Sequence, residues 1–255
     1  MKCRVLLRLS NPDSLRRTSP AAGSEPQIVR FDPFFLLIFP IFLFSIVVHE
    51  CAHGLAALWC GDPTARERGR LTLNPIPHAD LVGSLVIPGA LLLLHAPFLI
   101  GWARPVPVDR ARLRDPLNDT VKVAMAGPLS NLILAVFFAA LVRLAPEPAT
   151  VGATGPLSIL APLGAMALAG VIWNVSLAIF NLLPIPPLDG SWLLMRFMKL
   201  RHILLLHQFR LVGLLVVAAV VSSPAVSNVL LRIPVRALVR ACLGLFGVSS
   251  EGLEL

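Results

Sequence analysis

Long apolar segments with few charges constrain this chain more than any other feature of its sequence. The chain has 255 residues, of which 56% are hydrophobic and only 14% are charged. Several apolar stretches reach the ~20 residues that a helix needs to cross a bilayer. We therefore predict an all-α, multi-pass integral membrane protein with about four to six transmembrane helices.

The formal charge of +8 does not indicate a nucleic-acid partner. The basic residues are scattered over short segments that flank the apolar runs, and they form no stripe with interleaved aromatic side chains. Retention of positively charged loops on one side of a membrane explains this distribution better. The four cysteines are widely separated and form no paired motif, so the sequence indicates neither a disulfide framework nor a cysteine zinc cluster.

Apolar runs of suitable length predict the membrane-crossing helices. These runs are Phe34 to Cys60, Val121 to Leu144, Leu157 to Leu183 and Ile203 to Val221. Residues 81 to 108 differ, because glycines and prolines such as Gly83 and Pro88 interrupt their apolar part. We expect this stretch to form a re-entrant or hairpin segment, since irregular backbone at membrane depth is tolerated where it lines a wet cavity.

These segments divide the chain into an N-terminal tail (residues 1–33), a membrane-embedded core (residues 34–202) and a C-terminal part (residues 203–255). The C-terminal part is predicted to hold a membrane helix and an amphipathic tail. In that tail, residues 232, 236 and 240 are arginines that form one basic stripe on an apolar helix. The stripe favours a helix lying in the membrane interface, and a tilted span whose arginines reach the surface is the alternative.

The run His49-Glu50-Cys51-Ala52-His53 lies inside the first apolar segment. Between residues 34 and 59, His49, Glu50 and His53 are the only histidine or charged residues. The two histidines are four positions apart, so a helix places both on one face, where they can share a metal ion. Glu50 is placed to accept a proton from water that the metal activates. Because an ionisable group in hydrocarbon costs at least ~2.5 kcal/mol, we interpret these residues as two ligands and a general base.

A catalytic zinc site usually has three protein ligands and one open position, so a third ligand is required. Asp189 is the best candidate. It follows an apolar helix that carries Asn174 and Asn181 on one face, and the break at Pro184 to Pro187 would let it turn toward the metal. Alternatively, Asp189 would N-cap a helix that begins near Ser191. The remaining histidines lack paired spacing and are predicted to be surface residues: His78, His95, His202 and His207.

Three motifs occur in a fixed order: His49-Glu50-Cys51-Ala52-His53, then Ala126-Gly127-Pro128-Leu129-Ser130-Asn131, then Asn181-Leu182-Leu183-Pro184-Ile185-Pro186-Pro187-Leu188-Asp189-Gly190. Together they resemble the site-2 protease family of intramembrane zinc metalloproteases. Leu71 to Pro75 and Gly101 to Val108 also resemble the compact members of that family, which lack a regulatory domain. The resemblance extends over residues 34 to 200.

The resemblance implies a role for each site residue. One Zn²⁺ per chain would be bound by His49, His53 and Asp189, with Glu50 as the general base. Asn181, with Asn174, would position the substrate or its oxyanion. The core of residues 34–202 would then be a zinc endopeptidase that cleaves a transmembrane segment of another membrane protein.

Topology provides an independent constraint on this arrangement. Asp189 reaches His49 and His53 only if the first segment and residues 157–183 run in the same direction across the membrane. One net crossing, residues 121–144, must then separate them. The loops that consequently share one side are residues 61–80, 102–119 and 189–202. Their arginines predict that this side is cytoplasmic, although the basic N-terminal tail would then lie on the opposite side, which the same rule disfavours.

Two other functions are compatible with parts of the pattern. A divalent-metal transporter could use the same ligands, but the adjacent Glu50 is superfluous for simple binding. A non-catalytic scaffold would not need intact ligands. No serine elbow and no pair of membrane aspartates indicates another type of intramembrane protease. We expect a protein of a bacterial cytoplasmic membrane whose partners are the lipid bilayer and a membrane-protein substrate with a transmembrane helix, while the oligomeric state is not determined by the sequence.

Overall fold

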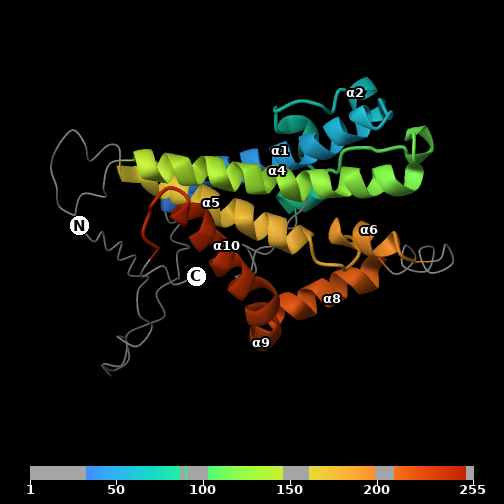
Figure 1. The fold of residues 1–255 in the computed structure, drawn as a ribbon. Coiled ribbons are helices and arrows are strands. Elements are labelled where there is room, and N and C mark those ends of the chain that lie inside the picture. The colour runs from blue at the N-terminus through green and yellow to red at the C-terminus, as the bar shows by residue number, and fades with distance from the viewer. Residues whose placement is uncertain (1–32, 87–89, 91–102, 146–160, 199–209, 251–255) are drawn as a thin grey trace, which may run out of the picture.

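Long helices form the core of the molecule. The computed structural model describes residues 33–86, 90, 103–145, 161–198 and 210–250, and all regular structure in these residues is helical. The longest helices are α1 (Pro33–Trp59), α4 (Pro116–Leu144) and α5 (Ala161–Asn181), and they lie side by side (Figure 1). The all-α fold predicted from the sequence is therefore confirmed.

These three helices are long and apolar enough to cross a membrane, over Ile38–Trp59, Pro116–Leu144 and Pro162–Asn181. A fourth span results if the C-terminal helices on either side of an 87° bend, Val212–Ser222 and Pro224–Gly244, are counted as one. With that count, the described residues meet the lower end of the predicted number of spans. The chain is an integral membrane protein.

Hydrogen bonds between α1 and α4 show that these helices are antiparallel. His53 on α1 pairs with the backbone oxygen of Val123 near the start of α4. His49, one turn earlier on α1, pairs with Asn131, which lies two turns later on α4. As α1 proceeds, its partners on α4 therefore move backward along the chain.

Helix α5 runs antiparallel to α4 in turn. The side chain of Asn131 donates a hydrogen bond to Asn174, while Gly170, one turn earlier on α5, faces the ring of Phe138. Helices α1 and α5 therefore run in the same direction, with α4 between them in sequence. This confirms the topology that was deduced from the need for Asp189 to reach the two histidines.

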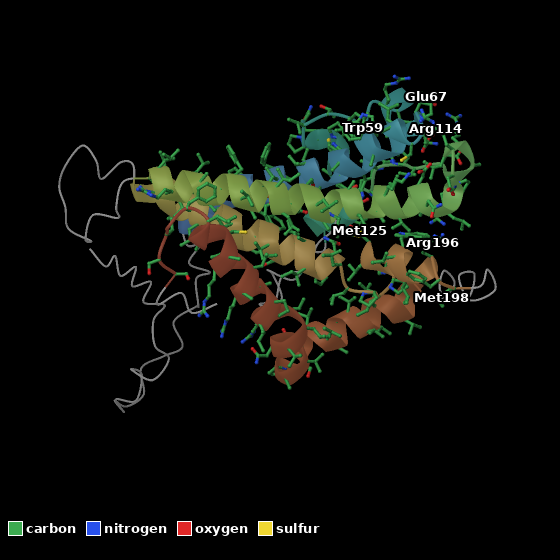
Figure 2. All side chains as sticks on the ribbon, in the orientation of Figure 1. Trp59, Glu67, Arg114, Met125, Arg196 and Met198 are labelled. Atoms are coloured by element: carbon green, nitrogen blue, oxygen red, sulfur yellow. The ribbon has the colours of Figure 1, made fainter. Side chains whose placement is uncertain are left out.

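Short elements collect at one end of the bundle. Helices α2 (Thr64–Glu67) and α6 (Gly190–Met195) lie at this end (Figure 1), and the 3₁₀ turns η2 (Ile76–His78) and η4 (Arg110–Arg112) belong to the same connecting loops. Glu67, Arg114 and Arg196, which Figure 2 labels, all lie at this end. Contacts between the loops include hydrogen bonds from Arg114 N to Cys60 O (3.0 Å) and from Arg196 Nε to Asn118 Oδ1 (3.0 Å). The predicted clustering of the three arginine-rich loops on one side is confirmed for their described parts.

The C-terminal helices fold back onto the core. Helix α8 (Arg210–Ser222) is followed by α9 (Pro224–Ser227), the π-helical turn η6 (Asn228–Arg232) and α10 (Ile233–Gly244). Helix α10 packs its apolar face, including Val235, Val239 and Leu243, into the cluster formed by α4 and α5. The bent pair of α8 and α10 is a broken span or a re-entrant loop by its length and composition, and whether residues 225–248 span the membrane or lie on it stays a prediction.

The predicted re-entrant segment is described only in part. Residues Leu81–Val86 form a π-helical turn, η3, whose backbone begins with a hydrogen bond from Gly83 N to Asp80 Oδ1 (2.7 Å). Residues 87–89 and 91–102 lie outside the described residues, as do residues 1–32 and 199–209. The re-entrant segment and the boundaries of the three predicted parts therefore stay predictions.

Close packing of α4 on α5 generates a prediction for stability. A Cβ atom on Gly170 would lie 2.5 Å from Cγ of Phe138, so Gly170→Ala should overpack this contact and lower the free energy of unfolding by about 1–3 kcal/mol. On the same helix, a Cβ on Gly164 would lie 3.3 Å from the Cβ of Ala145, so Gly164→Ala is a milder, matched control. Thermal unfolding in detergent measures both variants. Equal stability of Gly170→Ala and the wild type would contradict the packing described here.

Candidate metal centre

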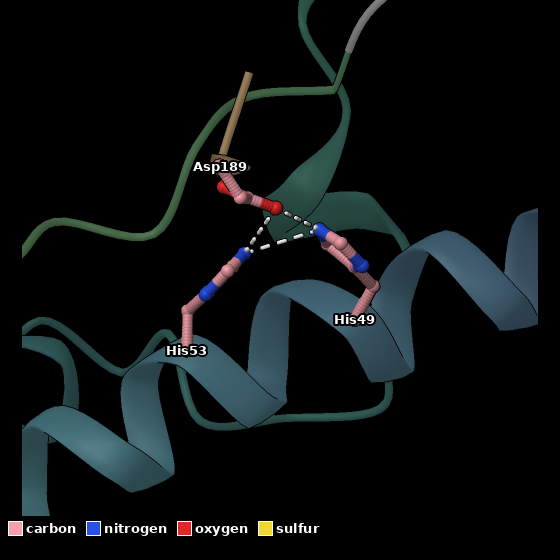
Figure 3. Close-up of side chains that lie close together, drawn as sticks. All are labelled: His49, His53 and Asp189. Atoms are coloured by element: carbon pink, nitrogen blue, oxygen red, sulfur yellow. Dashed lines mark hydrogen bonds and ion pairs between the residues drawn. The ribbon is translucent and has the colours of Figure 1, made fainter. Parts of the chain in front are cut away.

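His49, His53 and Asp189 come together at one point in the bundle (Figure 3). The Nε2 atoms of the two histidines are 3.1 Å apart, and Asp189 Oδ2 lies 3.1 Å from His49 Nε2 and 3.4 Å from His53 Nε2. Two ligand atoms bound to one tetrahedral zinc ion at about 2.0–2.1 Å are separated by about 3.3 Å. The three atoms therefore have the spacing of a zinc ligand set.

The hydrogen bonds of the two imidazole rings show which nitrogen of each ring is available to bind a metal ion. His53 Nδ1 lies 2.7 Å from Val123 O, a carbonyl that can only accept, so Nδ1 donates the proton. His49 Nδ1 lies 2.6 Å from Asn131 Oδ1 and donates to it in the same way. In the neutral rings, both Nε2 atoms consequently present lone pairs toward Asp189.

Asp189 Oδ2 and the two Nε2 atoms form a group of three hydrogen-bond acceptors, and no donor lies among them. This oxygen is buried and has no hydrogen-bond partner. Two imidazole lone pairs and one carboxylate oxygen would repel one another unless a cation lay between them. Among the described residues, this is the one group of at least three His, Cys, Asp or Glu side chains placed to hold an ion. The donor set of two nitrogens and one oxygen fits zinc.

The position of Asp189 distinguishes between its two predicted roles, a metal ligand and the N-cap of the following helix. It occupies the position before α6, yet its side chain makes no capping hydrogen bond. The carboxylate instead lies beside the two histidines. The adjacent Gly190 allows this, because a Cβ there would lie 2.1 Å from the backbone oxygen of Leu182. Only glycine lets the chain fold back so tightly after α5.

A buried amide network fixes the orientation of His49. Asn131 accepts from His49 and donates through Nδ2 to Asn174 Oδ1 (2.9 Å). Asn174 Nδ2 donates in turn to Ser45 Oγ (2.9 Å) and to Gly170 O (2.8 Å). Ser45, Asn131 and Asn174 are fully buried. The network therefore joins α1, α4 and α5 around one candidate metal ligand.

The resemblance implied that Asn174 helps Asn181 to position the substrate or its oxyanion, and this role stays a prediction. In the structure the amide of Asn174 is fully buried and its polar atoms are bonded within the bundle. Its position favours orienting Asn131, and through it His49. Asn131 belongs to the second sequence motif, but no role was predicted for it. A polar amide within an apolar membrane-length helix is the sequence feature that indicates a functional role for Asn131.

Gly127 lets α4 approach the metal centre. A Cβ atom on this residue would lie 2.5 Å from His53 Nε2 and 2.6 Å from His49 Nε2. Any larger residue would thus collide with the ligand atoms. The glycine of the second motif is required by the close approach of the helix backbone to the two imidazoles.

Glu50 lies on α1 between the two histidines and is half-buried. Its Oε2 atom accepts a hydrogen bond from the backbone N–H of Val106 (2.9 Å). Glu50 is not one of the three grouped ligands. The position of Glu50 outside the group is compatible with a general base, and that role stays a prediction.

Two further expectations concern Asn181 and His78. Asn181 is half-buried and donates to Leu177 O (2.9 Å); its role in positioning substrate stays a prediction. The expectation that His78 is a surface residue was wrong, because its side chain is only 2% exposed and lies 2.9 Å from Thr72 O. The other three histidines predicted at the surface, His95, His202 and His207, lie outside the described residues.

Comparison with known proteins agrees with this geometry. The family model of peptidase family M50 matches residues 148–223, which include Asp189. "Putative zinc metalloprotease YwhC" of Bacillus subtilis is 41% identical over 169 residues, covering 63% of this chain and 70% of that protein. "Putative zinc metalloprotease Rip2" of Mycolicibacterium smegmatis is 31% identical over 156 residues, 61% of this chain and 55% of that protein. Rip2 of Mycobacterium tuberculosis is 28–29% identical over 185 residues, 66% of this chain and 60% of that protein. No solved structure matches the chain.

The chain belongs to peptidase family M50, the site-2 protease family. It is a metalloprotease of that family by its relatives and by the donor set that its fold brings together. The resemblance seen in the three sequence motifs is thereby confirmed.

The amide network generates a prediction for metal binding. Asn131→Leu removes the acceptor for His49 Nδ1, so zinc affinity should fall by about 10- to 100-fold, as for other partners of metal-binding histidines. Asn131→Asp keeps an acceptor at that position and should retain more zinc affinity than the leucine variant. Competition with a chromophoric chelator measures both. A folded Asn131→Leu protein with wild-type zinc affinity would show that the network does not support the ligand.

Proposed function

We propose that this protein is an intramembrane zinc endopeptidase that cleaves a transmembrane segment of other membrane proteins. The observation that carries the proposal is the meeting of His49, His53 and Asp189 beside Glu50 within a bundle of apolar, membrane-length helices. Three metal ligands with an adjacent carboxylate are the catalytic residues that a zinc metallopeptidase requires. Its location in membrane-length helices points to substrates that are themselves in the bilayer.

The depth of the site supports this class of substrate. His53 is six residues before the end of α1 at Trp59, which corresponds to about 9 Å along a helix. The site is therefore set back from the loop-bearing end of the bundle, yet it is nearer to that end than to Pro33. A peptide bond would have to enter the membrane-embedded part of the protein to reach Glu50.

The chemistry divides between the metal and the side chains. A bound zinc ion would polarise the scissile carbonyl and lower the pKa of water. Glu50, as a carboxylate held by Val106 N–H, would accept a proton from water and deliver it to the leaving amine. His49 and His53 keep their Nδ1 protons on Asn131 and Val123 O, so they take no part in that transfer.

The substrate must present an unwound segment, because the carbonyls of an intact helix are bonded within it. We propose that Asn181, at the end of α5, positions such a segment or its developing oxyanion. The substrate would be a membrane protein with a transmembrane helix, and each chain would bind one zinc ion.

We also propose that the site opens toward the cytoplasm of a bacterial cell. The loops at the site end carry many arginines, among them Arg66, Arg68, Arg70, Arg112 and Arg114. Positively charged loops are retained on the cytoplasmic side of a membrane. The relatives YwhC and Rip2 are bacterial proteins.

Separating zinc binding from proteolysis tests the proposal. Glu50→Gln should abolish cleavage of a panel of single-span membrane proteins in proteoliposomes while the purified variant retains its zinc, because Glu50 is a base and not a ligand. His49→Ala, the matched control on the same helix turn, should lose both zinc and cleavage. Zinc content is measured by elemental analysis.

Two outcomes would contradict the proposal. Cleavage by Glu50→Gln at the wild-type rate would remove Glu50 from the chemistry. Zinc flux across proteoliposomes by the wild type, dependent on His49 and without cleavage of any substrate in the panel, would favour a divalent-metal transporter.

A further inference from the structure

The carboxylate of Glu50 is held by a segment far from it in sequence. Its partner is the backbone N–H of Val106, at 2.9 Å. Val106 lies between Pro105 and Pro107, neither of which has an N–H. The only backbone donor available in residues 105–107 is therefore directed at Glu50. The prolines also favour an extended backbone here, which limits how far that donor can move.

The segment lies tightly against α1. Val106 is 7% exposed, and a Cβ atom on Gly54 of α1 would lie 3.0 Å from its Cγ1. The same Cβ would lie 2.5 Å from Leu71 Cδ2. A bare glycine on α1, one turn after Glu50, is thus what allows Val106 to approach this closely.

Buried His78 fixes the first end of the segment. The backbone oxygen of His78 accepts from Arg104 N (2.8 Å), and its Nε2 donates to Thr72 O (2.9 Å). Cys51 on α1 donates to the same Thr72 carbonyl (3.0 Å), which ties His78 to the catalytic helix. From the opposite side, Arg70 Nη2 donates to Arg104 O (2.7 Å). The backbone just before Val106 is therefore bonded through both its N–H and its carbonyl.

Buried Asp62 fixes the other end. Its side chain is fully buried, Oδ2 accepts from Asp109 N (2.6 Å), and Oδ1 accepts from both the backbone N–H (2.9 Å) and the hydroxyl of Thr64. Burial alone would raise the pKa of Asp62, but the hydrogen bonds from Thr64 and Asp109 outweigh it and lower the pKa below its ordinary value. Asp62 is therefore ionised near neutral pH, and its carboxylate accepts the hydrogen bond that holds Asp109 in place. Asp109 is three residues after Val106 in the chain.

We propose that Asp62 and His78 are positioning residues: by fixing both ends of residues 104–109, they set where Val106 holds the carboxylate of Glu50. The inference rests on the proposed function, in which Glu50 is the base. Neither residue is among the grouped metal ligands. Their loss should therefore reduce turnover and leave zinc binding intact, whereas loss of the amide network around His49 should weaken zinc binding.

Variants of Val106 test the hydrogen bond between its backbone N–H and Glu50. Val106→Pro keeps an apolar, extended residue but removes the N–H, so kcat should fall by about 10- to 100-fold with zinc content unchanged, as for a displaced catalytic group. Val106→Ala keeps the N–H and should retain most of the wild-type kcat. Equal activity of the proline variant and the wild type would overturn the inference.

Variants of the two remote residues test the positioning itself. Asp62→Asn and His78→Leu should lower kcat by about 10-fold or more, with KM within about twofold of wild type and zinc retained. His78→Gln keeps a donor for Thr72 O and should recover most of the kcat. Asp119→Asn is the matched control: Asp119 is also a buried carboxylate at this end and accepts from Asp115 N (2.9 Å), but it does not bond to residues 104–109.

The outcomes separate this inference from the proposed function. If Glu50→Gln is inactive while Asp62→Asn and His78→Leu are folded and keep wild-type kcat, the positioning role is wrong and the function stands. If those two variants lose zinc, their effect is on the metal centre, and the inference is again wrong. If Glu50→Gln keeps full activity, the proposed function and this inference both fail. Should Asp62→Asn not fold, the variants of His78 and Val106 decide.

Discussion

Polar groups within an apolar bundle must find their partners inside it, and the structure around His49 is built on that constraint. The bilayer core holds no water that could form hydrogen bonds with a buried amide or imidazole, so each unpaired polar group would lower the stability of the fold. His49, Asn131, Asn174 and Ser45 meet this requirement by bonding to one another across α1, α4 and α5. The group that stays unsatisfied is the set of Nε2 and carboxylate acceptors around Asp189, and a bound cation would satisfy it.

The same constraint links the packing of the helices to the chemistry of the site. Glycine at position 127 brings α4 onto the imidazoles, and glycine at position 170 brings α5 onto α4. The amide network can form only when all three helices are in register. Two groups of contacts then support α1. The amide network would orient His49 for metal binding, while Val106 in residues 104–109 donates a hydrogen bond to Glu50 from the loop-bearing end. Binding and turnover would thus depend on different parts of the chain.

Much of this arrangement could be predicted from the sequence, because its strongest signals are local or topological. The spacing of His49 and His53 follows from helix geometry, and the direction of α5 follows from the need for Asp189 to meet them. The supporting residues could not be predicted in this way. His49 and Asn131 are 82 positions apart, and Glu50 and Val106 are 56 apart, so no periodicity connects them. His78 was misassigned to the surface because an isolated histidine carries no signal of burial; its environment comes from Thr72, Cys51 and Arg104, which the fold brings next to it.

X-ray absorption at the zinc edge of the purified protein tests whether His49, His53 and Asp189 bind zinc, since it reports the ligand atoms themselves. We expect one zinc per chain with nitrogen and oxygen neighbours at about 2.0–2.1 Å, and with the outer-shell scattering of two imidazoles. A sulfur neighbour at about 2.3 Å, which would place a cysteine such as Cys51 in the ligand set, would contradict the account. So would the absence of imidazole scattering in a protein that holds stoichiometric zinc.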